Sequence, residues 1–393
     1  MTMRTVYADN NATTQVAPEV LELMLPFFKE QFGNPSSMHY LAKPAEQAIT
    51  TAREQVACLL NADPSEIVFT SCGTESNNAA IRGGLAALPH RKHIITTRVE
   101  HPAVRNVCQY LGKNGYRVTE LSVDKTGHLD LDELRETLDE DTALVSIMWA
   151  NNETGVVFPV KEIADMVKSR GALLHCDAVQ AAGKLPVDLR TVNIDLLSIS
   201  GHKLHAPKGI GVLYIRRGTY FSPLLIGGHQ EKGRRAGTEN VPYIAGLGKA
   251  CELALDHLQD EQTRVKSMRD RLEKELLEKA LDASVNGDPV NRLPNTTSIS
   301  FKYIEGEAIL LMLSVEGIAA SSGSACTSGS LEPSHVLRAM GVPFTRVHGS
   351  IRFSLSRYNS DEDITYIVEK MVPIARRLRE ISPFGRDELY AAK

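Results

Sequence analysis

The chain has 393 residues, 42% of them hydrophobic and 23% charged, a composition typical of a globular protein of two or three domains. The formal net charge of −4 argues against nucleic acid or an anionic membrane surface as the main partner. No apolar run approaches the ~18 residues of a membrane helix. The start, MTMRTVYADNNATT, shows no apolar signal region, so we expect a cytoplasmic protein.

The middle of the chain alternates helix-like and strand-like runs. Helices are predicted at 51–60 (TAREQVACLL) and 160–169 (VKEIADMVKS). Strands are predicted at Glu66–Thr70, Lys92–Val99, Ala143–Trp149, Ala172–Cys176, Ile194–Ser200 and Gly211–Ile215. This alternation predicts an α/β fold with a mostly parallel sheet covered by helices on both faces.

The last third of the chain has a different pattern. A long amphipathic helix is predicted at about 250–280, and a closing helix at about 361–381. Between them, 297–303 (TSISFKY) and 350–356 (SIRFSLS) alternate like strands with one wet face. We therefore expect a second, smaller α+β domain.

The cysteines are scattered along the chain. No C-x-x-C pair and no H-E-x-x-H pattern occurs, which argues against a disulfide framework and a structural zinc site. Cys326 is unusual because it lies in SSGSACTSGS (321–330), where small and polar neighbours offer nothing to pack around the sulfur. A free cysteine usually behaves as a small buried hydrophobic residue, so a cysteine at this position requires another explanation.

Polar or titratable groups follow consecutive predicted strands. In open α/β sheets, ligands bind beyond the carboxyl ends of the strands, so these groups are expected at one site. They are Thr74, His101, Asn152, Asp177 with Gln180, and Lys203.

Taken singly, Lys203 is typical of a solvated surface lysine and Asp177 of a helix cap, but as a pair they are more informative. A lysine forms a Schiff base with pyridoxal phosphate (PLP), and an aspartate keeps the pyridine nitrogen protonated. Gly73-Thr74 at a helix start suits an anion such as a phosphate, although an ordinary helix cap explains it equally well.

Three further features each allow two interpretations. His101 is either a helix cap or an imidazole stacked on a flat cofactor. Arg352 is either part of a surface salt bridge or a rigidly held carboxylate ligand. Gly233–Asn240 (GRRAGTEN) is either a solvated basic loop or a turn that meets phosphate.

Ten sequence blocks together resemble the cysteine desulfurases, most closely those of the nitrogen-fixation (NifS) type in the class-V aminotransferase family. They span nearly the whole chain in the family's order. The blocks are DNNATT (9–14), FGNPSS (32–37), FTSCGTE (69–75), EHP (100–102), NNETG (151–155), DAVQ (177–180), SGHKLHAPKG (200–209), RAGTEN (235–240), SGSAC (322–326) and IRFSLSR (351–357).

The resemblance implies the PLP-dependent transferase fold type I. A large PLP-binding domain at 15–260 would hold a mostly parallel seven-stranded sheet. A smaller α+β domain would combine 1–14 with 261–393 and carry a mobile catalytic cysteine loop at about 321–333. The resemblance also implies a homodimer.

Residue roles follow from the same resemblance. Lys203 would hold PLP, Asp177 would pair with its pyridine nitrogen, Gln180 would pair with the ring hydroxyl, and His101 would stack on the ring and act as acid/base. The groups around the phosphate would be Gly73, Thr74, Ser200 and His202, with Thr238 from the partner subunit.

The substrate side of the site is implied in the same way. Asn152 and Arg352 would bind the carboxylate of L-cysteine, with Asn152 also near the cofactor. Cys326 would attack the substrate sulfur, release L-alanine and carry a persulfide, as in a sulfurtransferase. The acceptor would be an iron–sulfur scaffold protein, serving nitrogenase maturation or general cluster assembly, with Cys326 as a candidate transient iron–sulfur ligand.

Two other functions compete with this interpretation. Another PLP enzyme of the same fold is one, either an aminotransferase, which has no use for the Cys326 loop, or a selenocysteine lyase. The other is a non-catalytic iron–sulfur carrier, for which one exposed cysteine is too few because such clusters usually take four ligands.

Overall fold

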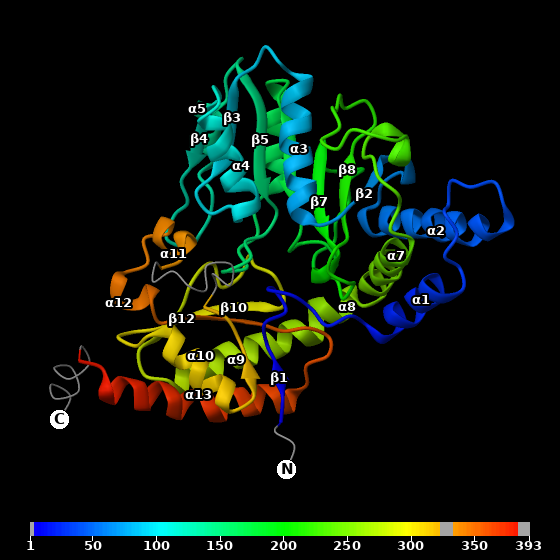
Figure 1. Cartoon of the computed structure of the whole chain (residues 1–393). Coiled ribbons are helices and arrows are strands. Elements are labelled where there is room, and N and C mark those ends of the chain that lie inside the picture. The colour runs from blue at the N-terminus through cyan, green and yellow to red at the C-terminus, as the bar shows by residue number, and fades with distance from the viewer. Residues whose placement is uncertain (1–3, 323–332, 384–393) are drawn as a thin grey trace.

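A computed structural model describes residues 4–322 and 333–383 of the chain. A large sheet flanked by helices forms one part, and a small sheet packed on long helices forms the other (Figure 1). The N-terminal strand β1 (Val6–Tyr7) lies with the small sheet, although the chain then enters the large part.

The large sheet has seven strands in the order β2-β8-β7-β6-β5-β3-β4. Only β8 runs against its neighbours among these strands, and because it is antiparallel to both β2 and β7, those two point the same way as the rest. The predicted mostly parallel α/β sheet is confirmed. The strands are β2 (Ile67–Thr70), β3 (His93–Thr97), β4 (Arg117–Leu121), β5 (Thr142–Met148), β6 (Leu173–Asp177), β7 (Leu196–Ser200) and β8 (Gly211–Ile215).

The edge strand β4 was absent from the sequence prediction. Its residues RVTEL are mostly half-exposed, so it lacks the apolar run that marks the central strands. An edge strand pairs on one side only and needs less apolar surface.

Helices cover both faces of this sheet, as predicted. On one face α3 and α4 bury Ile81, Leu85 and Val104 against Ile94 and Leu144. On the other face, the apolar sides of α1, α2, α6 and α7 form the larger core. The helices are α1 (Pro18–Lys29), α2 (Lys43–Leu60), α3 (Gly73–Ala87), α4 (Pro102–Gly112), α5 (Leu131–Thr137), α6 (Val160–Ser169) and α7 (Val241–Asp256).

The small sheet is antiparallel, with the order β12-β10-β9. Beside it, β1 pairs in parallel with β11 (Ile318–Ala319). The elements are β9 (Ala283–Val285), β10 (Thr296–Phe301), β12 (Ser350–Ser354), α9 (Lys266–Lys279), α10 (Gly306–Val315), α11 (His335–Ala339), α12 (Phe344–Val347) and α13 (Asp361–Ile381).

A separate hydrophobic cluster underlies the small sheet. It joins Val6 and Ala8 with apolar residues from Val265 onward in the sequence. This cluster supports the division near residue 260, which we retain as a proposal.

Two sequence expectations for this part are wrong. The helix at 250–280 is interrupted: α7 ends at Asp256, and a short α8 (Leu258–Asp260) and a π-helical turn (Glu261–Val265) precede α9. A π turn adds a residue per turn and changes which side chains face inward. Glu261 is buried as a result, with 8% of its surface exposed.

The wet face expected for β10 and β12 is also wrong, since every residue of both strands is buried. Ile299, Phe301 and Phe353 face the small core, and the opposite face, with Arg352 and Ser354, contacts the N-terminal segment. Alternation alone cannot distinguish a wet face from one that packs on polar neighbours.

In the part of the chain that the structure describes, the helices are all too short or too polar to cross a bilayer.

Candidate active site

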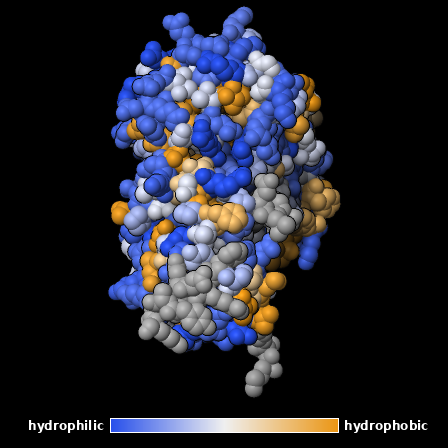
Figure 2. Space-filling view, turned by 90° about the vertical axis from the view of Figure 1, so that its left-hand side faces the viewer, coloured by the Kyte–Doolittle hydropathy of each residue, from blue (hydrophilic) through white to orange (hydrophobic). Residues whose placement is uncertain are grey.

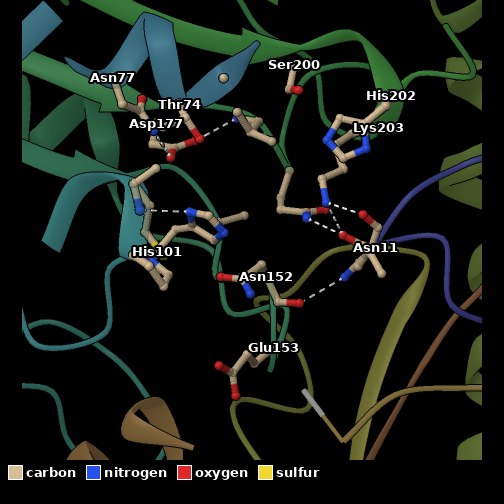
Figure 3. A pocket seen from close by; sticks show the side chains of 18 of the residues that line it. Asn11, Thr74, Asn77, His101, Asn152, Glu153, Asp177, Ser200, His202 and Lys203 are labelled. Atoms are coloured by element: carbon tan, nitrogen blue, oxygen red, sulfur yellow. Dashed lines mark hydrogen bonds between the residues drawn. The ribbon is translucent and has the colours of Figure 1, made fainter. Parts of the chain in front are cut away.

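A cavity of about 380 Å³ lies where the carboxyl ends of the large sheet meet the small sheet. Its side chains come from strand ends, a helix start and the N-terminal segment (Figure 3). Ten of the predicted site residues line it: Gly73, Thr74, His101, Asn152, Asp177, Gln180, Ser200, His202, Lys203 and Arg352.

Lys203 ends a 3₁₀ turn (Gly201–Lys203) that follows β7. Its Nζ donates to the backbone oxygens of Asn11 (2.6 Å) and Ala12 (2.7 Å). The turn requires glycine, because a Cβ at Gly201 would lie 2.7 Å from Ile210 Cγ2. The ammonium is therefore held at the cavity wall by the N-terminal segment (Figure 3).

Asp177 is the last residue of β6 and is 6% exposed. Its Oδ2 accepts a hydrogen bond from Asn77 Nδ2 (2.8 Å), and its Oδ1 accepts one from the Val179 amide (3.0 Å). These donors fix the orientation of the carboxylate. A buried, oriented carboxylate is the group needed to hold a protonated ring nitrogen.

His101 caps α4, as one of its two sequence interpretations predicts, and it also lines the cavity. Its Nδ1 accepts the Ala103 amide hydrogen at 3.1 Å, so in the neutral ring the proton is on Nε2. Burial lowers the pKa of His101, and Lys203 and His335 lower it further, against the opposing effect of Asp177. His101 is therefore neutral at physiological pH.

The start of α3 forms the end of the cavity suited to an anion. A Cβ on Gly73 would lie 3.1 Å from both Ser200 Cβ and Val179 Cγ2, so glycine keeps this corner open. Thr74 and Ser200 add hydroxyls beside the helix start, whose amides favour negative charge. His202 also lines the cavity, and burial with the nearby Lys203 lowers its pKa to about 4.

Arg352 enters the cavity from β12 and is 2% exposed, so the surface salt-bridge alternative is wrong. Its Nη2 pairs with Asp9 Oδ1 at 2.8 Å, and its Nη1 donates to the backbone oxygen of Asn152 at 2.8 Å. The guanidinium is thus buried, charged and held on a rigid strand. That arrangement suits a carboxylate ligand.

Sequence reasoning missed several polar residues of the cavity region. Asp9 and Asn11 lie in the DNNATT block, which gave the only signal, although no role was assigned to them. The sequence did not indicate Asn77, because this residue lies within helix α3 and does not follow a predicted strand. Glu153 accepts a hydrogen bond from Ser334 Oγ, and burial raises its pKa.

His335 is a further residue that the sequence did not indicate. It lines the cavity from the start of α11, and its Nε2 is 2.9 Å from the backbone oxygen of Glu100.

One predicted residue, Thr238, is not among the residues that line the cavity. Thr238 lies in a separate hollow with Ser71 and Arg235, and Arg235 pairs with Glu75 at 2.9 Å. Cys326 lies outside the described residues. The flanking described positions are close to the cavity, because Ser321 exchanges backbone hydrogen bonds with Arg352 and His335 lines the wall.

The family pattern of the Aminotransferase class-V proteins matches residues 6–367. The chain is 63% identical over 386 residues to the cysteine desulfurase of Trichormus azollae, covering 98% of this chain and 96% of that protein. The chain belongs to the class-V aminotransferases, among the cysteine desulfurases. It is also 57% identical over 383 residues to the cysteine desulfurase NifS of Azotobacter vinelandii (97% and 95% coverage).

Solved structures agree with this membership. A NifS-like protein superposes with a TM-score of 0.90 at 41% identity, covering 95% of this chain and all of that one. A structure described as SspA in complex with cysteine superposes with a TM-score of 0.80 at 37% identity, covering 91% of this chain and all of that one.

Class-V aminotransferases and cysteine desulfurases depend on PLP, and the cavity fits this cofactor. The open corner at Gly73 with its helix start suits the phosphate, and the fixed Asp177 carboxylate suits the ring nitrogen. Within the described residues, no cluster of histidine, cysteine and carboxylate side chains has the geometry of a metal site.

Proposed function

We propose that the protein is a cysteine desulfurase that takes sulfur from L-cysteine, releases L-alanine and carries the sulfur on Cys326. One observation carries the proposal: Lys203, Asp177, His101 and Arg352, from separate elements, line a single cavity in a chain of the cysteine desulfurase family.

PLP, when bound, withdraws electrons from the α-carbon of the amino acid substrate. Asp177 would hold the ring nitrogen protonated. Lys203 Nζ would hold the cofactor and then move the α-proton. His101 is neutral with its proton on Nε2, and it would pass a proton to or from the reacting atoms.

Arg352 and Asn152 would bind the substrate carboxylate. Because Asp9 already pairs with one guanidinium nitrogen, Arg352 keeps its direction before substrate arrives. Such pre-ordering lowers the entropy cost of placing the substrate.

Cys326 would be the nucleophile. Its thiolate attacks the substrate sulfur, so an S–S bond forms while the C–S bond breaks. The electron pair of the C–S bond stays on carbon, which takes up a proton and leaves as alanine. The persulfide is then transferred to an acceptor thiol.

We further propose a homodimer in which Thr238 of one subunit reaches the phosphate of the other. Thr238 lies outside the cavity of its own chain. Leu21, Leu25 and Phe28 of α1 are 50%, 42% and 55% exposed on one helix face, as an unpaired interface would require. The face that carries α5, α11 and α12 is mainly hydrophilic, with apolar side chains in small groups (Figure 2).

The sulfur acceptor would be an iron–sulfur scaffold protein in the cytoplasm, either dedicated to nitrogenase or general. Cys326 would ligate iron only transiently during transfer.

The test compares visible spectra of the purified protein before and after L-cysteine, with alanine and sulfide assayed. The wild type should bind PLP, change its absorption with cysteine and form both products. Cys326→Ala should keep the PLP absorption and lose sulfur transfer, whereas Cys58→Ala, at an exposed cysteine, should behave as wild type. Full desulfurase activity in Cys326→Ala would refute the nucleophile assignment.

Other results would favour the competing functions. Keto-acid formation without sulfide would indicate an aminotransferase. Faster turnover of selenocysteine than of cysteine would indicate a selenocysteine lyase. Failure of the protein to bind PLP would favour a non-catalytic iron–sulfur carrier.

A further inference from the structure

Lys184 is a buried lysine that the proposed reaction does not use. It follows β6 by one short loop and is 7% exposed. Its Nζ donates to Gln180 Oε1 at 2.8 Å and lies 3.4 Å from Asn11 Oδ1. Burying an amino group costs free energy unless it is hydrogen-bonded, so Lys184 Nζ depends on the side-chain oxygens of Gln180 and Asn11.

Lys184 and the backbone oxygen of Asn11 together fix which end of the Gln180 amide faces the cavity. Gln180 Nε2 donates one hydrogen to the backbone oxygen of Asn11 at 3.0 Å, and its Oε1 accepts from Lys184. A primary amide has two N–H donors and one carbonyl oxygen. Among the contacts of the described residues, the polar group that Gln180 has left for a ligand is its second N–H.

Asn11 connects this arrangement to the catalytic lysine. Its backbone oxygen accepts from both Gln180 and Lys203, and its side-chain oxygen faces Lys184. The same residue donates from Nδ2 to Thr296 of β10 (2.8 Å). The orientation of Gln180 is therefore fixed by Asn11, which lines the cavity, and by Lys184, which is not among the lining residues.

Charged groups from several elements surround Lys184. Burial lowers the pKa of Lys184, the negative charge of Glu261 in the π turn raises it, and the positive charges of Lys203 and Arg352 lower it, so that the pKa falls to about 7. Burial also raises the pKa of Glu261. The other titratable groups that line the adjoining hollow or interact with Lys184 are His202, His205, His257 and Arg357.

We propose that Lys184 is a positioning residue that acts through Gln180, holding the amide so that an N–H donor, and not the carbonyl oxygen, faces the ring oxygen of bound PLP. The inference rests on the proposed function, because it requires PLP in this cavity. A donor stabilises a negatively charged ring oxygen, whereas a carbonyl oxygen would repel it.

The test is a pH titration of the visible absorption of the PLP-loaded protein. Lys184→Met keeps the bulk of the side chain and removes the donor. The Gln180 amide then keeps only the Asn11 backbone oxygen as a partner and is held less firmly, so the absorption midpoint should rise by about half a pH unit or more, the scale on which lost hydrogen bonds shift a titration. The dissociation constant of PLP should also rise several-fold. Lys161→Met makes the same change on exposed α6 and should leave both values at wild type.

A double-mutant cycle separates this role from a general effect of charge. Gln180→Leu alone should raise the midpoint at least as far as Lys184→Met. If Lys184 acts through Gln180, the double variant should shift no further than Gln180→Leu. Midpoints that add in the double variant would overturn the proposal, as would a folded Lys184→Met protein with the wild-type midpoint.

If Lys184→Met does not fold, a second variant, Lys184→Gln, tests the same proposal. Lys184→Gln keeps the position polar but shortens the side chain and removes the charge, so its midpoint should rise as well, and a wild-type midpoint would again overturn the proposal. If the wild-type protein takes up no PLP, the proposed function itself fails. That outcome is distinct from a wild type that binds PLP and a Lys184 variant that titrates identically.

Discussion

The two sheets contribute to the same cavity in different ways. The large sheet contributes the carboxyl ends of its central strands, where Asp177 ends β6 and Lys203 follows β7. The small sheet contributes a face, from which Arg352 projects in the middle of β12. Residues at the carboxyl ends of neighbouring parallel strands lie close together because those strands end on the same side of the sheet. A residue on the face of a sheet lines a cavity only because other segments pack against that face.

The comparison predicts a hierarchy among substitutions. Substitutions at the carboxyl ends of the large sheet's strands should abolish turnover. Changes on the small sheet's face should weaken substrate binding, and changes to the residues that hold that face should have smaller effects again.

The largest effect is expected for Lys203→Ala. The variant loses the nitrogen that would hold the cofactor and move the α-proton, so the rate of alanine formation should fall at least ~10³-fold. Lys161→Ala, on exposed α6, is the matched control. Alanine formation within about tenfold of wild type would show that another group moves the proton.

Arg352→Gln should act mainly on substrate binding. Loss of a buried charge-assisted contact to the substrate carboxylate should raise KM by roughly 10- to 100-fold, with a smaller change in kcat. Steady-state kinetics with L-cysteine measure both. Arg4→Gln breaks the exposed Arg4–Asp363 pair and should leave KM unchanged. An unchanged KM in Arg352→Gln would remove Arg352 from the substrate site.

Asp9→Asn should give a weaker version of the same effect. The variant keeps the shape of the Asp9–Arg352 contact but removes its charge, so Arg352 is held less firmly. We expect KM to rise about three- to tenfold in Asp9→Asn alone. In the Arg352→Gln background, Asp9→Asn should cause no further rise in KM. Equal additive effects in the two backgrounds would show that Asp9 does not act through Arg352.

The smallest effect concerns stability and involves no substrate contact. Burial raises the pKa of Glu100 to about 8, so the folded protein holds a proton that the unfolded chain releases near its usual pKa of 4.5. This group therefore lowers the free energy of unfolding as pH rises from about 4.5 to about 8, by roughly 1 to 4 kcal/mol.

Glu100→Gln removes that dependence. Relative to wild type, the Tm of the variant should increase as pH rises across this range, measured by thermal denaturation. Glu162→Gln on exposed α6 is the control. Parallel Tm curves for wild type and Glu100→Gln would show that Glu100 is ionised in the folded protein.

The sequence alone predicts six of the seven strands of the large sheet and the polar groups at their carboxyl ends, but not the edge strand β4. Central strands such as β5 and β6 are continuous apolar runs, and the polar residues that follow them stand out against that background. Because parallel strands place their carboxyl ends together, Asp177 and Lys203 were assigned to one site from order alone. The resemblance to the cysteine desulfurases added roles that strand patterns do not contain.

The tertiary structure alone decided how the small sheet and the N-terminal segment complete the site. Alternation in 350–356 placed Arg352 opposite the apolar face but could not show that this face is buried. The π turn that buries Glu261 interrupts a stretch whose pattern predicts one helix. The contacts of Asn11 with Lys184, Gln180 and Lys203 join segments more than 160 residues apart. Local sequence patterns record periodicity within a segment, whereas hydrogen bonds between distant segments are fixed only when those segments pack together.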